Sequence, residues 1–90
     1  MTRTPETILV TGGSGFIGAN FIRYLFEEAF FAGRVINLDA LTYAGNPENL
    51  SDVDQAYQER YRFVHGSITD VELVNSIFAK EDVDTVVHFA

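Results

Sequence analysis

The sequence predicts an α/β fold in which about four parallel strands form one sheet in the order 3-2-1-4, with helices on both faces. Short runs of β-branched and aliphatic residues alternate with longer segments whose apolar residues recur every three or four positions. A cluster of glycines lies directly between the first such run and the first such segment. The chain has no internal repeat, low-complexity tract or linker, so one continuous series of strands and right-handed crossovers is expected.

The first strand is expected at Thr7–Thr11, because its middle is continuously apolar and glycines stop it abruptly. This is the pattern of a strand buried on both faces. A helix should begin at about Gly15 and end at Gly33. Its predicted apolar stripe, spaced by three and four residues, is Gly18, Ile22, Leu25 and Ala29.

The second strand, predicted at Val35–Asp39, ends in a carboxylate. The loop Ala40–Asn46 then leads to a short helix with Asn46 as N-cap and Pro47 at the first helical position. Residues Ser51–Glu59 are polar and acidic, so a solvated segment is expected there.

The third strand is predicted at Tyr61–His65, followed by a turn at Gly66. Thr69 and Glu72 have the spacing of a capping box, which predicts the start of the next helix. The apolar residues of that helix are Val71, Val74, Ile77 and Phe78. The fourth strand is predicted at Thr85–Phe89.

In this order the first and fourth strands are neighbours where the chain reverses direction across the sheet. Open α/β sheets bind ligands at that point, outside the carboxyl ends of the strands. The chain supplies both strand ends, near Gly12 and Ala90. We therefore expect residues 1–90 to form the N-terminal portion of a Rossmann-type dinucleotide-binding domain, with half of the crevice wall outside the chain.

The glycine cluster satisfies G-x-G-x-x-G from Gly13 and G-x-x-G-x-x-G from Gly12, between a strand and a helix. Gly12 would permit the tight turn, Gly15 would let the backbone approach a diphosphate, and Gly18 would let helix and strand pack closely. The anion would then meet free N–H groups at the positive end of the helix dipole.

Asp39 lies at the tip of the second strand, at the distance from the glycines where a carboxylate accepts hydrogen bonds from the adenosine ribose hydroxyls. The same carboxylate would repel the 2′-phosphate of NADP, and neither arginine nor lysine occurs in Ala40, Leu41 and Thr42. NAD is therefore the expected cofactor. A methyltransferase fold can also place glycines and an acidic residue in this way, so S-adenosylmethionine stays open as an alternative.

Composition and spacing disfavour several other classes of protein. The formal net charge is −7 with six basic residues, which argues against nucleic-acid and anionic-membrane surfaces as partners. The chain has no cysteine and no apolar run long enough to span a bilayer, so a cytoplasmic protein is the default expectation. A P-loop needs Lys and then Ser or Thr after its last glycine, whereas Ala19 and Asn20 follow Gly18.

No metal site is expected. His65 and His88 each lie within a predicted strand without a second ligand at useful spacing, so structural roles are expected for both. The remaining acidic cluster is interpreted as a solvated face of the short helix; it comprises Glu48, Asp52, Asp54 and Glu59.

Three runs resemble the extended short-chain dehydrogenases, a family of NAD-dependent epimerases and dehydratases: TGGSGFIG at 11–18, NLDALTYAGN at 37–46 and VVHFA at 86–90. LTYAGN after the aspartate is similar to the dTDP-glucose 4,6-dehydratases. The resemblance covers nearly the whole chain, from about Ile8 to Ala90.

The resemblance implies cofactor contacts at the pyrophosphate turn (Phe16, Ile17), the adenosine half (Asp39, Ala40, Leu41, Thr42) and the nicotinamide side (Ala90). The match breaks after the third strand, where the family usually has Gly-Asp-Ile, with that Asp accepting from the adenine amine. Here the run is Gly66, Ser67 and Ile68. A serine hydroxyl can accept the same hydrogen bond but, without charge, should stabilise it less.

The resemblance implies a lyase parent that oxidises a nucleotide sugar such as dTDP-glucose at carbon 4, eliminates water across carbons 5 and 6, and returns the hydride to carbon 6. That chemistry uses a Tyr-x-x-x-Lys pair, and none of the four tyrosines here is followed by lysine at that spacing. No catalytic residue is therefore assigned, and enzymatic activity of the chain itself is left open. A fragment of a related epimerase and a non-catalytic NAD-binding module are the alternatives. The resemblance also implies that the substrate domain lies outside residues 1–90 and that a homodimer is expected only of the longer parent.

Overall fold

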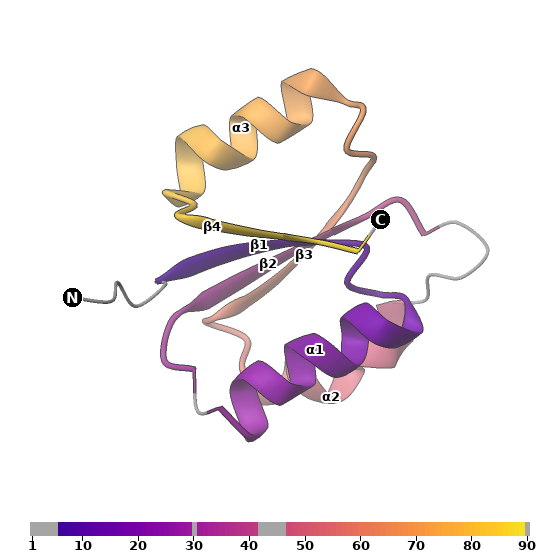
Figure 1. Cartoon of the computed structure of the whole chain (residues 1–90), viewed down its shortest axis with the longest axis vertical. Coiled ribbons are helices and arrows are strands. Elements are labelled where there is room, and N and C mark those ends of the chain that lie inside the picture. The colour runs from indigo at the N-terminus through magenta and orange to yellow at the C-terminus, as the bar shows by residue number, and fades with distance from the viewer. Residues whose placement is uncertain (1–5, 30, 42–46, 90) are drawn as a thin grey trace.

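The computed structural model describes residues 6–29, 31–41 and 47–89 (Figure 1). The elements in chain order are β1 Thr7–Thr11, α1 Phe16–Glu27, β2 Arg34–Asp39, the 3-10 helix η1 Pro47–Leu50, α2 Ser51–Ala56, β3 Tyr61–His65, α3 Val71–Glu81 and β4 Thr85–His88. The predicted residue ranges of β1 and β3 are confirmed, β2 begins one residue earlier than predicted, and β4 ends one residue earlier.

The strands form one parallel sheet in the order β3-β2-β1-β4, which confirms the predicted topology. Thr11, at the end of β1, pairs with Leu38 on one side and His88 on the other. Figure 1 shows α1 and α2 on one face of the sheet and α3 on the opposite face. Because the strands are parallel, their carboxyl ends lie on the same edge, where the glycine cluster begins α1.

Every residue of β1 is buried, as expected for a strand covered on both faces. Ile8 and Val10 belong to the cluster that packs against α1, whereas Leu9 belongs to the cluster that packs against Ile77 of α3. The alternation along β1 thus supplies apolar side chains to both layers.

The predicted C-terminal end of α1 is wrong. The helix ends at Glu27, because the N–H groups of Ala29 and Phe31 turn back onto the carbonyls of Tyr24 and Leu25 and close the last turn. The predicted apolar stripe is correct at Gly18 and Ile22, which are buried. Leu25 is only partly buried, and Ala29 is exposed and lies beyond the helix. The buried residues of α1 are Gly18, Ala19, Ile22 and Phe26.

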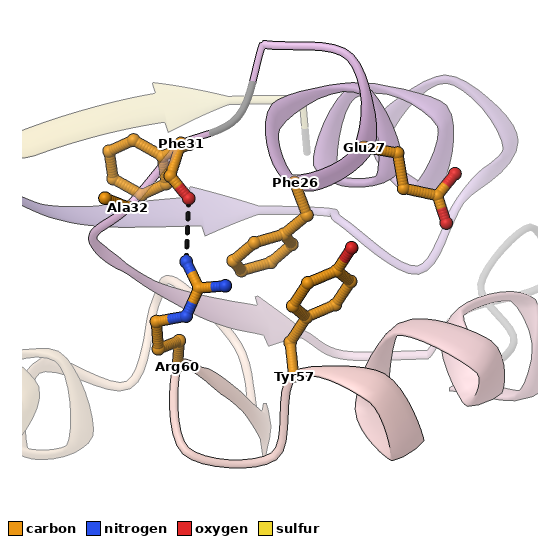
Figure 2. A pocket seen from close by; sticks show the side chains of 6 residues that line it. All are labelled: Phe26, Glu27, Phe31, Ala32, Tyr57 and Arg60. Carbon is orange, nitrogen blue, oxygen red and sulfur yellow. Dashed lines mark hydrogen bonds between the residues drawn. The ribbon is translucent and has the colours of Figure 1, made fainter.

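Phe26 is buried because the aromatic ring of Tyr57 stacks on it, with ring centroids 4.5 Å apart. The Arg60 guanidinium lies 5.3 Å from both ring centroids, and its Nη1 donates to the Phe31 carbonyl at 2.7 Å. Figure 2 shows these side chains around an open hollow of about 510 Å³, at the opposite end of α1 from the glycine cluster. The hollow therefore lies between the C-terminal end of α1, the segment before β2 and the segment between α2 and β3.

The segment formed by η1 and α2 packs against the rest of the protein, although its composition is polar and acidic. Leu50 and Val53 are buried, while Asp52 and its acidic neighbour Asp54 are exposed as predicted. Arg23 of α1 pairs with Asp52 at 3.0 Å, and the hydrogen bond from this guanidinium lowers the pKa of the Asp52 carboxyl. The predicted N-cap, Asn46, lies outside the described residues.

The predicted capping box of α3 is wrong. Asp70 is the N-cap, and its carboxylate accepts from the Leu73 N–H at 3.1 Å. The Thr69 N–H donates instead to the Ser67 hydroxyl in the preceding turn. Asp70 therefore supplies the acceptor that satisfies one of the free N–H groups in the first turn of the helix.

The predicted apolar stripe of α3 is also only partly correct. Ile77 is buried, but Val71 is 67% exposed and Phe78 is exposed as well. Glu81 takes a buried position, because its carboxylate bonds with Arg34 on β2 and Arg62 on β3. A charged residue thus anchors the face of α3 that turns towards the sheet.

In the described parts of the chain, no helix is both long and apolar enough to cross a membrane. Among these same residues, no group of His, Cys, Asp and Glu side chains is placed to hold a metal ion.

Candidate nucleotide-binding site

The turn after β1 depends on glycine at two positions. Gly12 has φ of +72°, a conformation that L side chains rarely adopt. A Cβ at Gly18 would overlap the Gly12 carbonyl oxygen and the Gly13 Cα. The predicted roles of Gly12 in the turn and of Gly18 in close helix packing are confirmed.

The N-terminus of α1 is open. Its N-cap is Gly15, no side chain caps this end, and the first turn has no acidic residue. The first intrahelical hydrogen bond runs from the Ala19 N–H to the Gly15 carbonyl. Phe16 and Ile17 are 81% and 69% exposed, so solvent reaches this end of the helix. Free N–H groups and the positive end of the helix dipole suit an anion here.

The Asp39 carboxylate lies beside this turn, at the end of β2. It is only 7% exposed, and its two oxygens accept from backbone N–H groups: Oδ2 from Ser14 and Oδ1 from Leu41, both at 2.8 Å. Leu41 has φ of +55°, so the chain bends sharply around this carboxylate. Each oxygen retains a lone pair with which it can accept a hydrogen bond from a ligand hydroxyl.

A buried polar network supports the turn from below, and the sequence analysis missed it. The Asn37 amide nitrogen donates to the Ser14 hydroxyl at 3.0 Å and to the Tyr61 hydroxyl at 3.1 Å. Burial raises the pKa of the Tyr61 hydroxyl. The available signal was the single amide in the otherwise apolar interior of the second strand, since a buried polar group needs a partner.

The residues predicted to contact the adenosine half lie on two neighbouring strand ends. Ala40 is exposed, and its carbonyl lies 3.2 Å from the His65 Nε2. Ser67 follows β3, and its hydroxyl accepts from the Thr69 N–H at 3.1 Å. Ile68 is exposed beside it. Thr42 and Ala90, the other two predicted contact residues, lie outside the described residues.

The second histidine lies at the junction of the first and fourth strands. The His88 Nδ1 and the Thr11 hydroxyl are 2.6 Å apart, which joins the carboxyl ends of β4 and β1. His65 has its partner at Ala40, just beyond β2, and His88 has its partner at the end of β1, so both histidines have hydrogen-bond partners near the ends of neighbouring strands.

A parallel sheet in this order, with a glycine turn at an uncapped helix start and an acidic residue at the end of the neighbouring strand, defines a Rossmann-type nucleotide-binding unit. The chain belongs to the GDP-mannose 4,6 dehydratase family, whose model matches residues 9–90. The resemblance to the extended short-chain dehydrogenases is thereby confirmed.

The relatives include several dTDP-glucose 4,6-dehydratases. The chain is 46% identical to that of Shigella flexneri over 92% of its own length and 22% of the relative, and 51% identical to that of Mycobacterium tuberculosis over 92% and 23%. It is also 48% identical to the low-salt glycan biosynthesis protein Agl12 of Haloferax volcanii, over 92% and 25%. The chain thus spans about a quarter of the length of these relatives.

Solved structures of dTDP-glucose 4,6-dehydratases are similar to this chain in fold as well as in sequence. The dTDP-glucose 4,6-dehydratase of Bacillus anthracis, in complex with NAD, superposes with a TM-score of 0.86 at 41% identity, over 94% of this chain and 26% of that one. The corresponding enzyme of Streptomyces venezuelae, also with NAD bound, gives 0.83 at 49% identity, over 93% and 26%.

Proposed function

We propose that this chain binds NAD at the carboxyl edge of its sheet. The observation that carries the proposal is the Asp39 carboxylate, which lies against the glycine turn at the uncapped start of α1. The first N–H groups of α1 would hold the diphosphate, and Asp39 would accept hydrogen bonds from the adenosine ribose hydroxyls. The structures similar to this chain include dehydratases solved with NAD.

Gly15 and its two neighbours complete the diphosphate part of the proposed site. The Gly15 backbone is extended, with φ of −74° and ψ of 173°, which any residue can adopt. Glycine is therefore not needed there for its conformation, and we assign it to close approach of the diphosphate. Phe16 and Ile17 follow it at the start of the helix and would flank the diphosphate with their backbone.

The adenosine half of NAD would lie over the ends of β2 and β3. Ala40, Leu41 and Thr42 continue from Asp39, and the Gly66 N–H donates to the Asp39 carbonyl, which brings Ser67 and Ile68 to the same edge. We assign these five residues to the adenosine side and Ala90, after β4, to the nicotinamide side.

For the longer protein we propose a dTDP-glucose 4,6-dehydratase, of which this chain is the N-terminal, NAD-binding portion. Identities of 41–51% to such dehydratases support this more strongly than the 25% identity to a UDP-glucose-4-epimerase with NAD. When held by these residues, NAD would supply reversible hydride transfer to a reaction in which the hydride removed from carbon 4 of the sugar is delivered to carbon 6 after loss of water across carbons 5 and 6. The residues of this chain would hold and orient the cofactor, because the Tyr-x-x-x-Lys pair is not among them.

Calorimetric titration of the purified protein with NAD, NADP and S-adenosylmethionine tests the proposal. We expect NAD to bind and NADP to bind more weakly, because the Asp39 carboxylate repels the 2′-phosphate. Binding of S-adenosylmethionine in preference to NAD would overturn the assignment.

We also propose that the protein works in the cytoplasm without a nucleic-acid or membrane partner. The net charge of −7 supports the second part, because it disfavours binding to these anionic partners. A gel-shift assay at low ionic strength and a vesicle sedimentation assay should both show no binding.

A further inference from the structure

Ser14 is the most constrained residue of the glycine turn. It is fully buried, and each of its three polar atoms has a side-chain partner. Its N–H donates to Asp39 Oδ2 at 2.8 Å, its carbonyl accepts from Asn49 Nδ2 at 2.8 Å, and its hydroxyl accepts from Asn37 Nδ2 at 3.0 Å. The partners come from the end of β2, from η1 and from the middle of β2.

The Asn37 amide cannot move without disturbing the turn. Its nitrogen bonds with two hydroxyls, and its buried Oδ1 has no hydrogen-bond partner. A Cβ at Gly13 would overlap that oxygen, so Oδ1 lies directly against the backbone of the turn. Burial of an amide oxygen without a partner is costly, which indicates that the position of this side chain contributes something that an apolar residue would not.

We propose that Ser14 is a positioning residue for ribose recognition, held by Asn37 and Asn49 so that its N–H orients the Asp39 carboxylate towards the adenosine ribose. Ser14 would not itself touch the cofactor. The inference rests on the proposed NAD site. It adds that the selectivity of this site for a ribose hydroxyl depends on a buried serine.

The direction of the effect follows from the geometry of Asp39. One carboxylate oxygen is oriented by Ser14, the other by Leu41. If the Ser14 N–H shifts, Asp39 loses one of these two restraints, and the hydrogen bonds to the ribose become less well aligned. The diphosphate contacts at the start of α1 do not pass through Asp39, so they should change little.

The test compares NAD with an analogue that lacks the adenosine 2′-hydroxyl, using calorimetry on the wild-type protein and three variants. Ser14→Ala removes the bond from Asn37 but keeps the backbone N–H. Asn49→Ala removes the bond to the Ser14 carbonyl at an exposed position, where folding is least at risk. Ser76→Ala is the matched control, because it removes a partly buried hydroxyl that donates to the Leu73 carbonyl within α3, outside the network of Ser14, Asn37 and Tyr61.

We expect Ser14→Ala to weaken NAD binding about three- to tenfold while the affinity for the analogue stays within about twofold, so that the preference for NAD falls. Asn49→Ala should act in the same direction, and Ser76→Ala should leave the preference for NAD over the analogue unchanged. An unchanged preference in Ser14→Ala overturns the inference, and if that variant does not fold, an unchanged preference in Asn49→Ala overturns it. Equal weakening of the binding of both ligands by Ser14→Ala and Ser76→Ala also overturns it, because this is the result of general destabilisation.

The two proposals can fail separately. A wild-type protein that binds NAD but shows no dependence of the preference on Ser14 leaves the NAD site standing and removes only the positioning role. A wild-type protein that binds neither NAD nor the analogue overturns both.

Discussion

Asp39 combines two tasks in one side chain. Its carboxylate satisfies two backbone N–H groups that would otherwise be left without a protein partner, and it lies beside the proposed position of the adenosine ribose. A charged acceptor is stronger than a neutral one for both tasks. The residue is therefore important to the shape of the site as well as to its proposed chemistry.

Replacing Asp39 by Ala should weaken NAD binding by about an order of magnitude, the scale of a lost pair of charge-assisted hydrogen bonds. Calorimetry measures the dissociation constant directly, and far-ultraviolet circular dichroism of the same sample checks that the sheet is retained. Asp39→Asn is the matched control, because it keeps the size and an acceptor oxygen but removes the charge. A dissociation constant unchanged in both variants would exclude the assigned role.

Ser67 offers a gain-of-affinity experiment. Its hydroxyl is engaged with the Thr69 N–H and with the Thr69 hydroxyl, in the turn that leads into α3. An aspartate at this position can make the same turn contact with one oxygen and present the other, charged, to the adenine amine. Ser67→Asp should therefore tighten NAD binding several-fold in the same titration, with Ser67→Ala for comparison. Weaker or equal binding would mean that the adenine lies elsewhere.

At the scale of the element, α3 is fastened to the sheet by Glu81. Its buried carboxylate pairs with Arg34 on β2 and Arg62 on β3, while both arginines remain partly exposed. The hydrogen bond from Arg34 lowers the pKa of the Glu81 carboxyl below its ordinary value of 4.5 in spite of burial, and the charges of Arg34 and Arg62 act in the same direction. The C-terminal end of α3, a helix with a modest apolar face, is thus held to the sheet by ion pairs.

This arrangement predicts an acid-dependent loss of stability. Because the pKa of Glu81 is lower in the folded than in the unfolded protein, its stabilising contribution is present above the unfolded-state value and is lost as pH falls through the folded-state value. The free energy of unfolding in urea, measured from pH 7 down to about pH 3, should fall less steeply in Glu81→Gln than in the wild type below about pH 4.5. Asn75→Gln, which changes a side chain without a titratable group at an exposed position of the same helix, is the control and should keep the wild-type slope.

At the scale of the whole molecule, the edge formed by β4 is the weak point. In the part of the chain that the structure describes, β4 pairs with β1 alone, and Val86 is 50% exposed. Phe89 packs against Phe21 but remains exposed, and Phe78 of α3 is exposed as well. An unpaired apolar edge is a template for association with another chain.

We therefore expect the isolated 90-residue chain to aggregate or to express poorly, and Val86→Lys to increase its monomeric fraction, because a charge at an edge strand disfavours edge-to-edge pairing. Sedimentation velocity at several concentrations measures that fraction. Asn75→Lys, which adds a lysine at an exposed position of α3 away from the edge strand, changes the net charge by the same amount and is the control. A monodisperse wild-type monomer that unfolds cooperatively would contradict the expectation.

Local sequence patterns were sufficient to predict the strands, their order in the sheet and the glycine turn. Short segments carry the signals, such as the apolar run of β1 stopped by Gly12 and the carboxylate at the end of β2. The spacing at which apolar residues recur in each segment indicates whether it forms a strand or a helix. The rules for parallel sheets then leave few arrangements, which is why the order of the strands followed. The pairing of the glycine motif with Asp39 was also predictable, because it depends on position along the chain.

Contacts between segments that are distant in sequence could not be predicted from local patterns. Ser14 meets Asp39 across 25 residues of sequence, and Glu81 meets Arg34 across 47. Phe26 rather than Leu25 is buried because the ring of Tyr57 covers it, and Asn37 is tolerated in the core because two hydroxyls meet its amide. Such contacts depend on where folding brings other side chains, since the free energy of burying a polar or aromatic group is set by the partners it finds there and not by its neighbours along the chain.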